Sequence, residues 1–211
     1  MLRAILDYAV VINNAALKRF ARDGYEFTRN LYYPEVGLFM EWTKPWGGGE
    51  TCEMADMVAL AIRLSDSGIG GYWEDVDRFV RNQLVEQQHV PETGTEKAIG
   101  TFVIGGEFVS IREGQIAGCC TDNGSQALYY AWESILRVVG KHVRINLLLN
   151  RASPQMDIDS YLPYEGKVVL KNKKAKSCSV RLPAWVDLKA VTSRAGGRVA
   201  AVYSGRPSHA V

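Results

Sequence analysis

Two short segments, far apart in the sequence, carry most of the side chains that bind soft metal ions in this 211-residue chain. The first is Glu50-Thr51-Cys52. The second is Gly118-Cys119-Cys120 with Asn123 three residues further on, so that three of the four cysteines fall in these two places. Each segment also opens an apolar-periodic run that is typical of a helix. We expect the two segments to meet in the fold and to form one site.

These side chains have the ligand preferences of zinc. Three thiolates and one carboxylate complete the tetrahedral shell that zinc favours, and each thiol gives up a proton when the ion binds. Two adjacent cysteines such as Cys119 and Cys120 cannot both form relaxed disulfides with distant partners. They can share one metal ion at a bend of the chain, so the residue types predict a zinc site.

The same segments carry a resemblance to a known family. The Glu-x-Cys motif at residues 50–52, the Cys119-Cys120 pair followed by Asn123, and the later strand Val180–Trp185 resemble the β-L-arabinofuranosidase family of glycoside hydrolases, which has a cysteine nucleophile on zinc. The resemblance extends from about Tyr32 to Trp185. It implies a multidomain fold, α then β, with helices of an (α/α)6 toroid followed by an antiparallel β-sandwich. The family's enzymes are much longer, so we expect this chain to be a fragment.

The resemblance also implies roles for individual residues. The zinc ligands would be Glu50, Cys52, Cys119 and Cys120. Cys119, the first cysteine of the pair, would be the nucleophile that attacks the anomeric carbon of a glycan substrate, and water would then release the sugar with retention of configuration.

A glutamate upstream of the Glu-x-Cys motif would be the general acid/base in such an enzyme. Glu41 is the first candidate and Glu35 the second, and both lie in an irregular segment, Pro34–Gly49. Aromatic rings beside carboxylates suit a sugar site, because rings stack on the apolar faces of sugars. The alternative is that these rings anchor the loop to the core, and for any single ring this alternative is the stronger of the two. The aromatic residues are Tyr32, Tyr33, Phe39, Trp42 and Trp46.

Periodicity divides the chain into a helical part and a strand part. We expect a helical domain over residues 1–140 and a β domain over 141–211. Asp122 or Asn123 is expected to cap the last helix, with Cys119 and Cys120 just before it. The helices are expected at 2–23, as one long or two short helices with Gly24 as a stop and a further turn or two at 25–33, and at 50–67, 72–88 and 124–139. A short hairpin is expected at 101–104 and 108–111, and strands at 143–149, 157–162, 167–170, 177–182 and 199–203.

Composition excludes several classes of function. The 25 basic and 23 acidic residues are too evenly balanced to indicate a nucleic acid or a membrane surface as partner. Four cysteines do not make a disulfide scaffold, and no signal peptide opens the chain, so a cytoplasmic location is expected. No apolar run reaches the roughly 18 to 20 residues that a membrane-spanning helix needs.

Two alternatives to an active glycosidase stay open. The chain could be a catalytically inactive, zinc-stabilised or carbohydrate-binding fragment. It could also be a redox protein in which Cys119 and Cys120 form a strained vicinal disulfide, although Glu50-Thr51-Cys52 would then have no role. The fourth cysteine, Cys178, lies on an expected strand and is expected to be structural.

Overall fold

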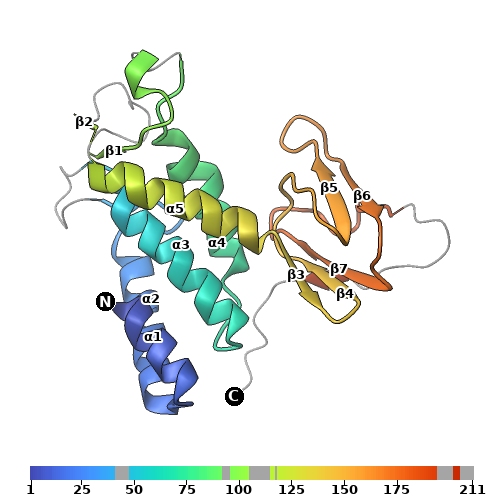
Figure 1. Ribbon diagram of the computed structural model, residues 1–211, viewed down its shortest axis with the longest axis horizontal. Helices are drawn as coiled ribbons and strands as arrows, with labels where there is room; N and C mark the ends of the chain where they lie inside the picture. Colours follow the sequence, from blue (N-terminus) through green and yellow to red (C-terminus); the bar gives the residue numbers. More distant parts are fainter. Residues whose placement is uncertain (41–47, 92–95, 105–114, 117, 194–201, 205–211) are drawn as a thin grey trace. The chain divides into compact units, whose positions relative to one another are not determined.

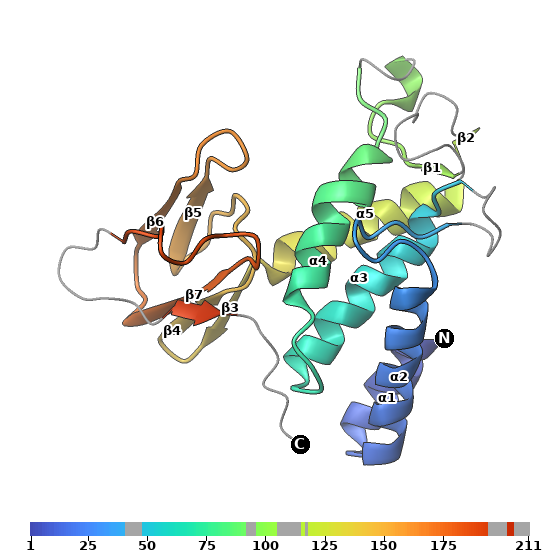
Figure 2. The ribbon, with the colours of Figure 1, turned by 180° about the vertical axis from the view of Figure 1, so that it is seen from behind.

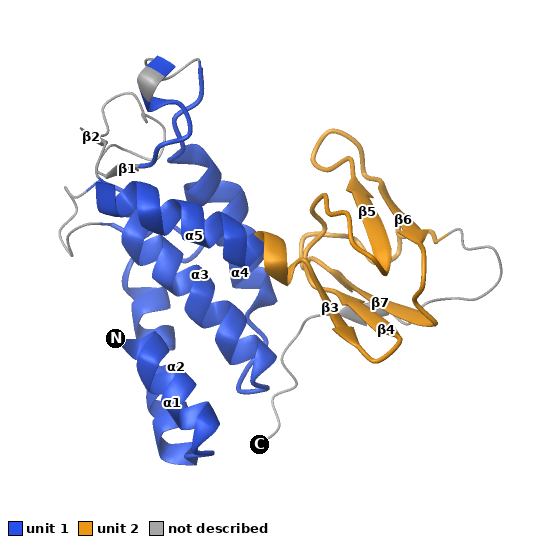
Figure 3. Cartoon of the chain, viewed as in Figure 1, with its two compact units in different colours: residues 1–131 blue, residues 132–211 orange. Residues whose placement is uncertain are grey.

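The computed structural model describes residues 1–40, 48–91, 96–104, 115–116, 118–193 and 202–204. Helices precede most of the strands, as the sequence predicts (Figure 1). The chain divides into two compact units, residues 1–131 and 132–211 (Figure 3), whereas the predicted boundary follows residue 140.

The first unit consists mainly of helices and contains the candidate site. Its elements are α1 (Leu2–Val11), α2 (Ala15–Leu31), α3 (Thr51–Asp66), α4 (Trp73–Phe79), the π-helical turn η1 (Val80–Leu84), the 3-10 turn η2 (Glu96–Ala98), the paired strands β1 (Val103–Ile104) and β2 (Gln115–Ile116), and most of α5 (Gly118–Ser134). The first strand of the expected hairpin is therefore present, but its partner is β2. The expected partner, 108–111, lies outside the described residues.

The first helical segment is two helices with a sharp break between them. Asn13 has a left-handed φ of 52°, and the Asn14 side chain accepts a hydrogen bond from the Leu17 amide at 3.0 Å, which caps α2. Gly24 was expected to end the helix, with a further helical turn or two over 25–33; in fact α2 continues through Gly24 without a break to Leu31. A Cβ at Gly24 would lie 2.9 Å from the Leu2 side chain, so this glycine lets α1 pack closely on α2.

Helix α3 is the centre of the first unit. It packs against α1, α2, α4 and η1, and Figure 2 shows it between α2 and α4. Its bounds agree with the helix expected at 50–67. A helix that is apolar on most of its circumference is buried in the core, and ten of its side chains are buried: Thr51, Met54, Ala55, Met57, Val58, Ala59, Leu60, Ala61, Ile62 and Leu64.

A buried carboxylate joins α2 to α4. The side chain of Asp75 is 2% exposed and forms an ion pair with Arg29, with an Nε to Oδ2 distance of 2.6 Å. It also accepts a hydrogen bond from the Tyr25 hydroxyl at 2.8 Å. Burial, and then the charge of Asp75, raise the pKa of Tyr25 well above its ordinary value, so its hydroxyl stays a donor. Helices on both sides of α3 are thereby tied together.

The second unit is built from strands. Its strands are β3 (Leu136–Val139), β4 (His142–Ile145), β5 (Met156–Ser160), β6 (Val168–Asn172), β7 (Ser177–Leu182) and β8 (Val202–Ser204). A four-stranded sheet has the order β3-β4-β7-β8, and β5 and β6 form a separate antiparallel pair. We expected antiparallel strands throughout, but β4 and β7 pair in parallel, as do β7 and β8. The connection from β4 to β7 contains β5 and β6, which gives it the length that a parallel crossover needs.

Strand β3 corrects the expected extent of the last helix. The helical pattern was expected to continue to Val139, but α5 ends at Ser134 and residues 136–139 pair with β4. The turn between the two strands contains Gly140 at a φ of 62°, a conformation that glycine adopts readily. Cross-strand pairing therefore overrides the helical spacing of these apolar residues.

The Asp75 network makes a stability prediction. Asp75→Ala should lower the free energy of unfolding by about 3 kcal/mol, since it removes the buried counter-charge of Arg29, which keeps its longer contact with Glu26, and the acceptor of the Tyr25 hydroxyl. Urea denaturation followed by far-UV circular dichroism measures this change. As a control, Asp7→Ala removes an exposed ion pair with Arg63 and should cost less than about 1 kcal/mol. Equal effects of the two substitutions would contradict the role given to Asp75.

Candidate metal centre

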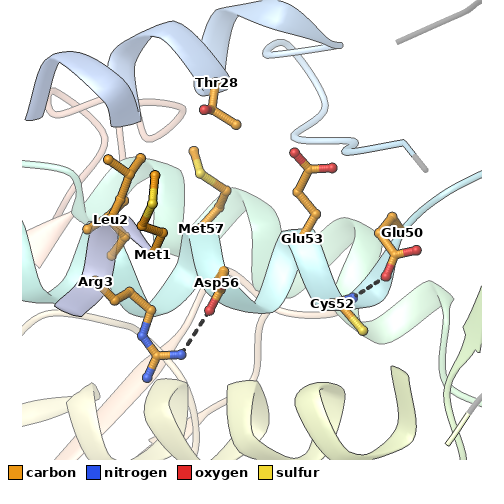
Figure 4. A pocket seen from close by; sticks show the side chains of 10 residues that line it. Met1, Leu2, Arg3, Thr28, Glu50, Cys52, Glu53, Asp56 and Met57 are labelled. Carbon is orange, nitrogen blue, oxygen red and sulfur yellow. Dashed lines mark hydrogen bonds and ion pairs between the residues drawn. The ribbon is translucent and has the colours of Figure 1, made fainter. Parts of the chain in front are cut away.

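Glu50 is the N-cap residue immediately before α3, and its carboxylate lies against the first turn of the helix. The residue has an extended backbone, with a φ of −111° and a ψ of 106°, and its Oε1 accepts a hydrogen bond from the Cys52 amide at 2.9 Å. This is the N-cap arrangement, which suits an anionic side chain at a positive helix end. The cap fixes the carboxylate and Cys52 side by side, as Figure 4 shows.

A buried amide network holds the backbone at Glu50. The Gln83 side chain, on η1, accepts from the Phe39 amide at 2.7 Å and donates to the carbonyls of Phe39 and Glu50 at 2.9 and 3.2 Å. Gln87 accepts hydrogen bonds from Gln83 and from the Thr51 hydroxyl. Four of these residues, Phe39, Thr51, Gln83 and Gln87, are buried, and Glu50 is partly buried. Hydrogen bonds from the π-helical turn η1 therefore fix the backbone at the start of α3.

Helix α5 begins at Gly118, so Cys119 and Cys120 lie inside its first turn and not before it. The expectation that Asp122 or Asn123 caps this helix is wrong, because both residues follow its start. Phe102 packs against this turn: its amide donates to the Thr121 hydroxyl at 3.2 Å. A Cβ at Gly124 would lie 2.4 Å from the Phe102 ring, so glycine is needed there.

The first turns of α3 and α5 bring the three predicted cysteines together. The sulfur atoms of Cys52, Cys119 and Cys120 all lie within 4.8 Å of one another, in a cluster that can hold a metal ion. The sulfurs of Cys52 and Cys120 are 3.7 Å apart, and the Cys120 sulfur is 3.6 Å from the Glu50 Oε1. Cys120 is buried, Cys52 is half-buried and Cys119 is exposed.

Burial changes the acidity of two of these thiols. It raises the pKa of Cys52 to about 12, with a further contribution from its hydrogen bond to Glu50. Burial, and then the negative charge of Glu50, also raise the pKa of Cys120. Both pKa values are higher in the folded protein than in a free cysteine, so the neutral thiols contribute to the stability of the metal-free fold at neutral pH. This contribution to stability is lost progressively as the pH rises above about 8.5, the pKa of a free thiol. A bound cation would instead favour the thiolate forms of both cysteines.

Of the two alternative candidates for the general acid/base, the structure describes only Glu35. Glu35 is exposed, in the turn between Tyr33 and Leu38, and no contact among the described residues joins it to the cysteine cluster. Glu41 lies outside the described residues, as do Trp42 and Trp46.

Two of the aromatic residues of this segment pack against one another, and one of them, Phe39, is buried in the core. Phe39 is 2% exposed and its ring packs edge-on against Phe79, at a centroid distance of 5.0 Å. Tyr32 packs edge-on against Phe39 in turn, at 6.0 Å, while Tyr33 is exposed. Phe39 therefore anchors the segment to the core. Sequence periodicity could not decide this, since the segment has none.

A pocket of about 380 Å³ opens beside the cluster. Glu53 projects from α3 on the side opposite to the Cys52 sulfur, and Arg3 pairs with Asp56 at 2.9 Å (Figure 4). Burial raises the pKa of Glu53. The sequence interpretation missed this pocket, because its residues come from three helices and only Glu50 and Cys52 stood in a recognisable motif. The lining residues are Met1, Leu2, Arg3, Thr28, Glu50, Cys52, Glu53, Asp56, Met57 and Leu60.

Comparison with known proteins adds no relative to this picture. A scan against protein-family models finds no match, and a search of curated proteins finds no similar sequence. In the part of the chain that the structure describes, no helix is both long and apolar enough to cross a membrane. The site is therefore interpreted from its own geometry.

Metal binding should release protons. Because the pKa values of Cys52 and Cys120 are raised, both thiols are protonated at pH 7 before the ion arrives, and each must lose its proton to become a ligand. Zinc titration should release at least about two protons per ion, and the affinity should rise about 100-fold per pH unit near neutrality. Calorimetry in buffers of different ionisation enthalpy measures both. Cys178→Ser is the control and should change neither; binding without proton release would contradict thiolate ligation.

Oxidation of the metal-free protein should form a disulfide between α3 and α5. With peroxide, two thiols give a disulfide and two molecules of water. The Cys52 and Cys120 sulfurs need to move from 3.7 Å to about 2.05 Å. The vicinal pair Cys119-Cys120 lies in a helix, where successive side chains diverge by about 100°. Peptide mapping should find Cys52 cross-linked to α5. A vicinal disulfide as the main product would instead favour the redox alternative.

Proposed function

We propose that this chain binds one zinc ion through Glu50, Cys52, Cys119 and Cys120. The observation that supports this most directly is the spacing of the donor atoms. With zinc–sulfur bonds of about 2.3 Å and a zinc–oxygen bond of about 2.0 Å, two tetrahedral sulfur ligands lie about 3.8 Å apart and a sulfur and an oxygen about 3.5 Å apart. The corresponding separations here are 3.7 Å and 3.6 Å.

The same donor set supports a glycoside hydrolase that resembles the β-L-arabinofuranosidases. Zinc in this position would keep the sulfurs deprotonated at neutral pH and would stabilise the departing thiolate. Cys119 is the nucleophile: its exposed sulfur forms a bond to the anomeric carbon as the glycosidic carbon–oxygen bond breaks. Glu41, or Glu35, gives a proton to the leaving oxygen and then takes one from the water that attacks the thioglycosyl carbon.

The fold and the pocket are compatible with this proposal. Helices followed by strands agree with a partial (α/α)6 toroid followed by a β-sandwich, which is the finer architecture that the proposal requires. The pocket beside Cys52 has a volume of about 380 Å³, within the range of small-molecule sites. Its carboxylates and Arg3 offer acceptors and donors to sugar hydroxyls.

One observation favours a second candidate, an inactive zinc-stabilised fragment. Four protein ligands around zinc make a closed shell, which is typical of structural sites, whereas catalytic zinc usually keeps an open position. In the proposed enzyme the ion acts through its thiolate ligand and needs no open position. The two functions therefore differ in turnover and not in metal content.

Hydrolysis of a nitrophenyl β-L-arabinofuranoside tests the proposed enzyme. The zinc-loaded chain should release nitrophenol, Cys119→Ser should abolish the release, and Glu41→Gln or Glu35→Gln should slow it about 100- to 10,000-fold, as expected for loss of a general acid/base. Cys178→Ser should retain full activity. Activity that survives Cys119→Ser would contradict the mechanism, and one equivalent of zinc without turnover on a panel of glycosides would favour the inactive fragment.

A further inference from the structure

The side-chain amide of Asn123 connects the two helices at the metal centre. Its Nδ2 donates one hydrogen bond to the Cys52 sulfur at 3.3 Å and another to the Cys119 carbonyl oxygen at 3.0 Å. Cys119 lies in the first turn of α5 and Asn123 in the second, whereas Cys52 lies in the first turn of α3. One amide nitrogen thus uses both of its hydrogens within the cluster.

The orientation of this amide follows from its partners. A carbonyl oxygen can only accept a hydrogen bond, so the nitrogen of the Asn123 amide, and not its oxygen, must face the Cys119 carbonyl. The contact four residues back along α5 holds the side chain against its own helix. The remaining N–H is then directed at the Cys52 sulfur before any ion binds.

The three sulfurs consequently differ in their surroundings. Cys120 is 0% exposed and is shielded from reagents by burial. Cys52 lines the pocket, so a small reagent can reach it, but an N–H group already occupies one of its lone pairs. Cys119 is exposed, and within the described residues no donor hydrogen bonds to its sulfur. Cys119 is more exposed than Cys52, and the hydrogen bond from Asn123 to the Cys52 sulfur adds a second difference between these two cysteines.

We infer that Asn123 is a positioning residue that makes Cys52 a spectator ligand of the metal centre and leaves Cys119 as the reactive sulfur. The inference rests on the proposed zinc site and deepens it. A hydrogen bond to a ligand sulfur withdraws charge and directs the remaining lone pairs towards the ion, which is how partners behind the ligands tune metal centres. The sulfur that forms a bond to carbon is then selected by one amide group on α5.

Site-mapped alkylation tests this inference without any glycoside. Iodoacetamide transfers its acetamide carbon to a thiolate sulfur and releases iodide, and mass spectrometry locates the modified cysteine. Zinc-saturated wild-type protein should be modified at Cys119. Asn123→Ala should raise the rate of modification at Cys52 at least about 10-fold and weaken zinc binding about 10- to 100-fold, the range for loss of such a partner. Zinc is held at saturation in every sample and its content is measured.

Two further variants make the result specific. Asn123→Asp keeps the side-chain shape but loses the donor, so it should behave like Asn123→Ala even if the alanine variant folds poorly. Ser125→Ala, at an exposed position on the same helix, should leave the labelling pattern unchanged. A purely structural role for Asn123 would lower the melting temperature without moving the label between cysteines.

The outcomes separate this inference from the proposed function. Equal labelling of Cys52 and Cys119 in zinc-loaded wild-type protein, or labelling confined to Cys119 in both Asn123 variants, would overturn the inference alone. Zinc content well below one equivalent in the wild-type protein would overturn the proposed metal site itself. Absence of glycoside turnover would leave the labelling pattern as a valid result for an inactive zinc protein.

Discussion

The candidate metal centre depends on three sulfur atoms that come within 4.8 Å of one another where the first turns of α3 and α5 meet. Such a cluster is unfavourable for thiolates alone, because burial and the nearby Glu50 carboxylate raise the pKa values of Cys52 and Cys120. A divalent cation would remove this penalty, since it would attract the three sulfurs at once. Under the proposed function, metal binding would therefore favour the close approach of the first turns of α3 and α5.

The scaffold around the site supplies the rigidity that this interaction needs. Gln83 on the π-helical turn holds the Glu50 carbonyl, and π-helical turns occur frequently at functional sites. Phe102 packs on the first two turns of α5, where Gly124 leaves room for its ring. Both ligand-bearing turns are thus fixed by groups that bind no metal themselves, which is the arrangement expected of a preorganised centre.

Local chemistry made part of this structure predictable. The strand at 177–182 and the helix that follows Glu50 agree with their periodic patterns, and clustered cysteines predicted the meeting of two remote segments. Tertiary contacts decided the rest. Residues 136–139 pair with β4 although their spacing is helical, and α5 begins ahead of the polar residues that resemble a cap. The hydrogen bond from Asn123 to Cys52 joins residues 71 positions apart in the sequence. It could therefore not be predicted without the three-dimensional arrangement of α3 and α5.

X-ray absorption spectroscopy at the zinc edge tests the central claim most directly, because it measures the ligand shell of the bound ion. The account predicts one zinc ion with three sulfur neighbours at about 2.3 Å and one oxygen neighbour at about 2.0 Å. Substitution of Cys120 by serine should remove one sulfur from this shell. A shell made only of nitrogen and oxygen atoms, or one that keeps three sulfurs in the Cys120→Ser protein, would contradict it.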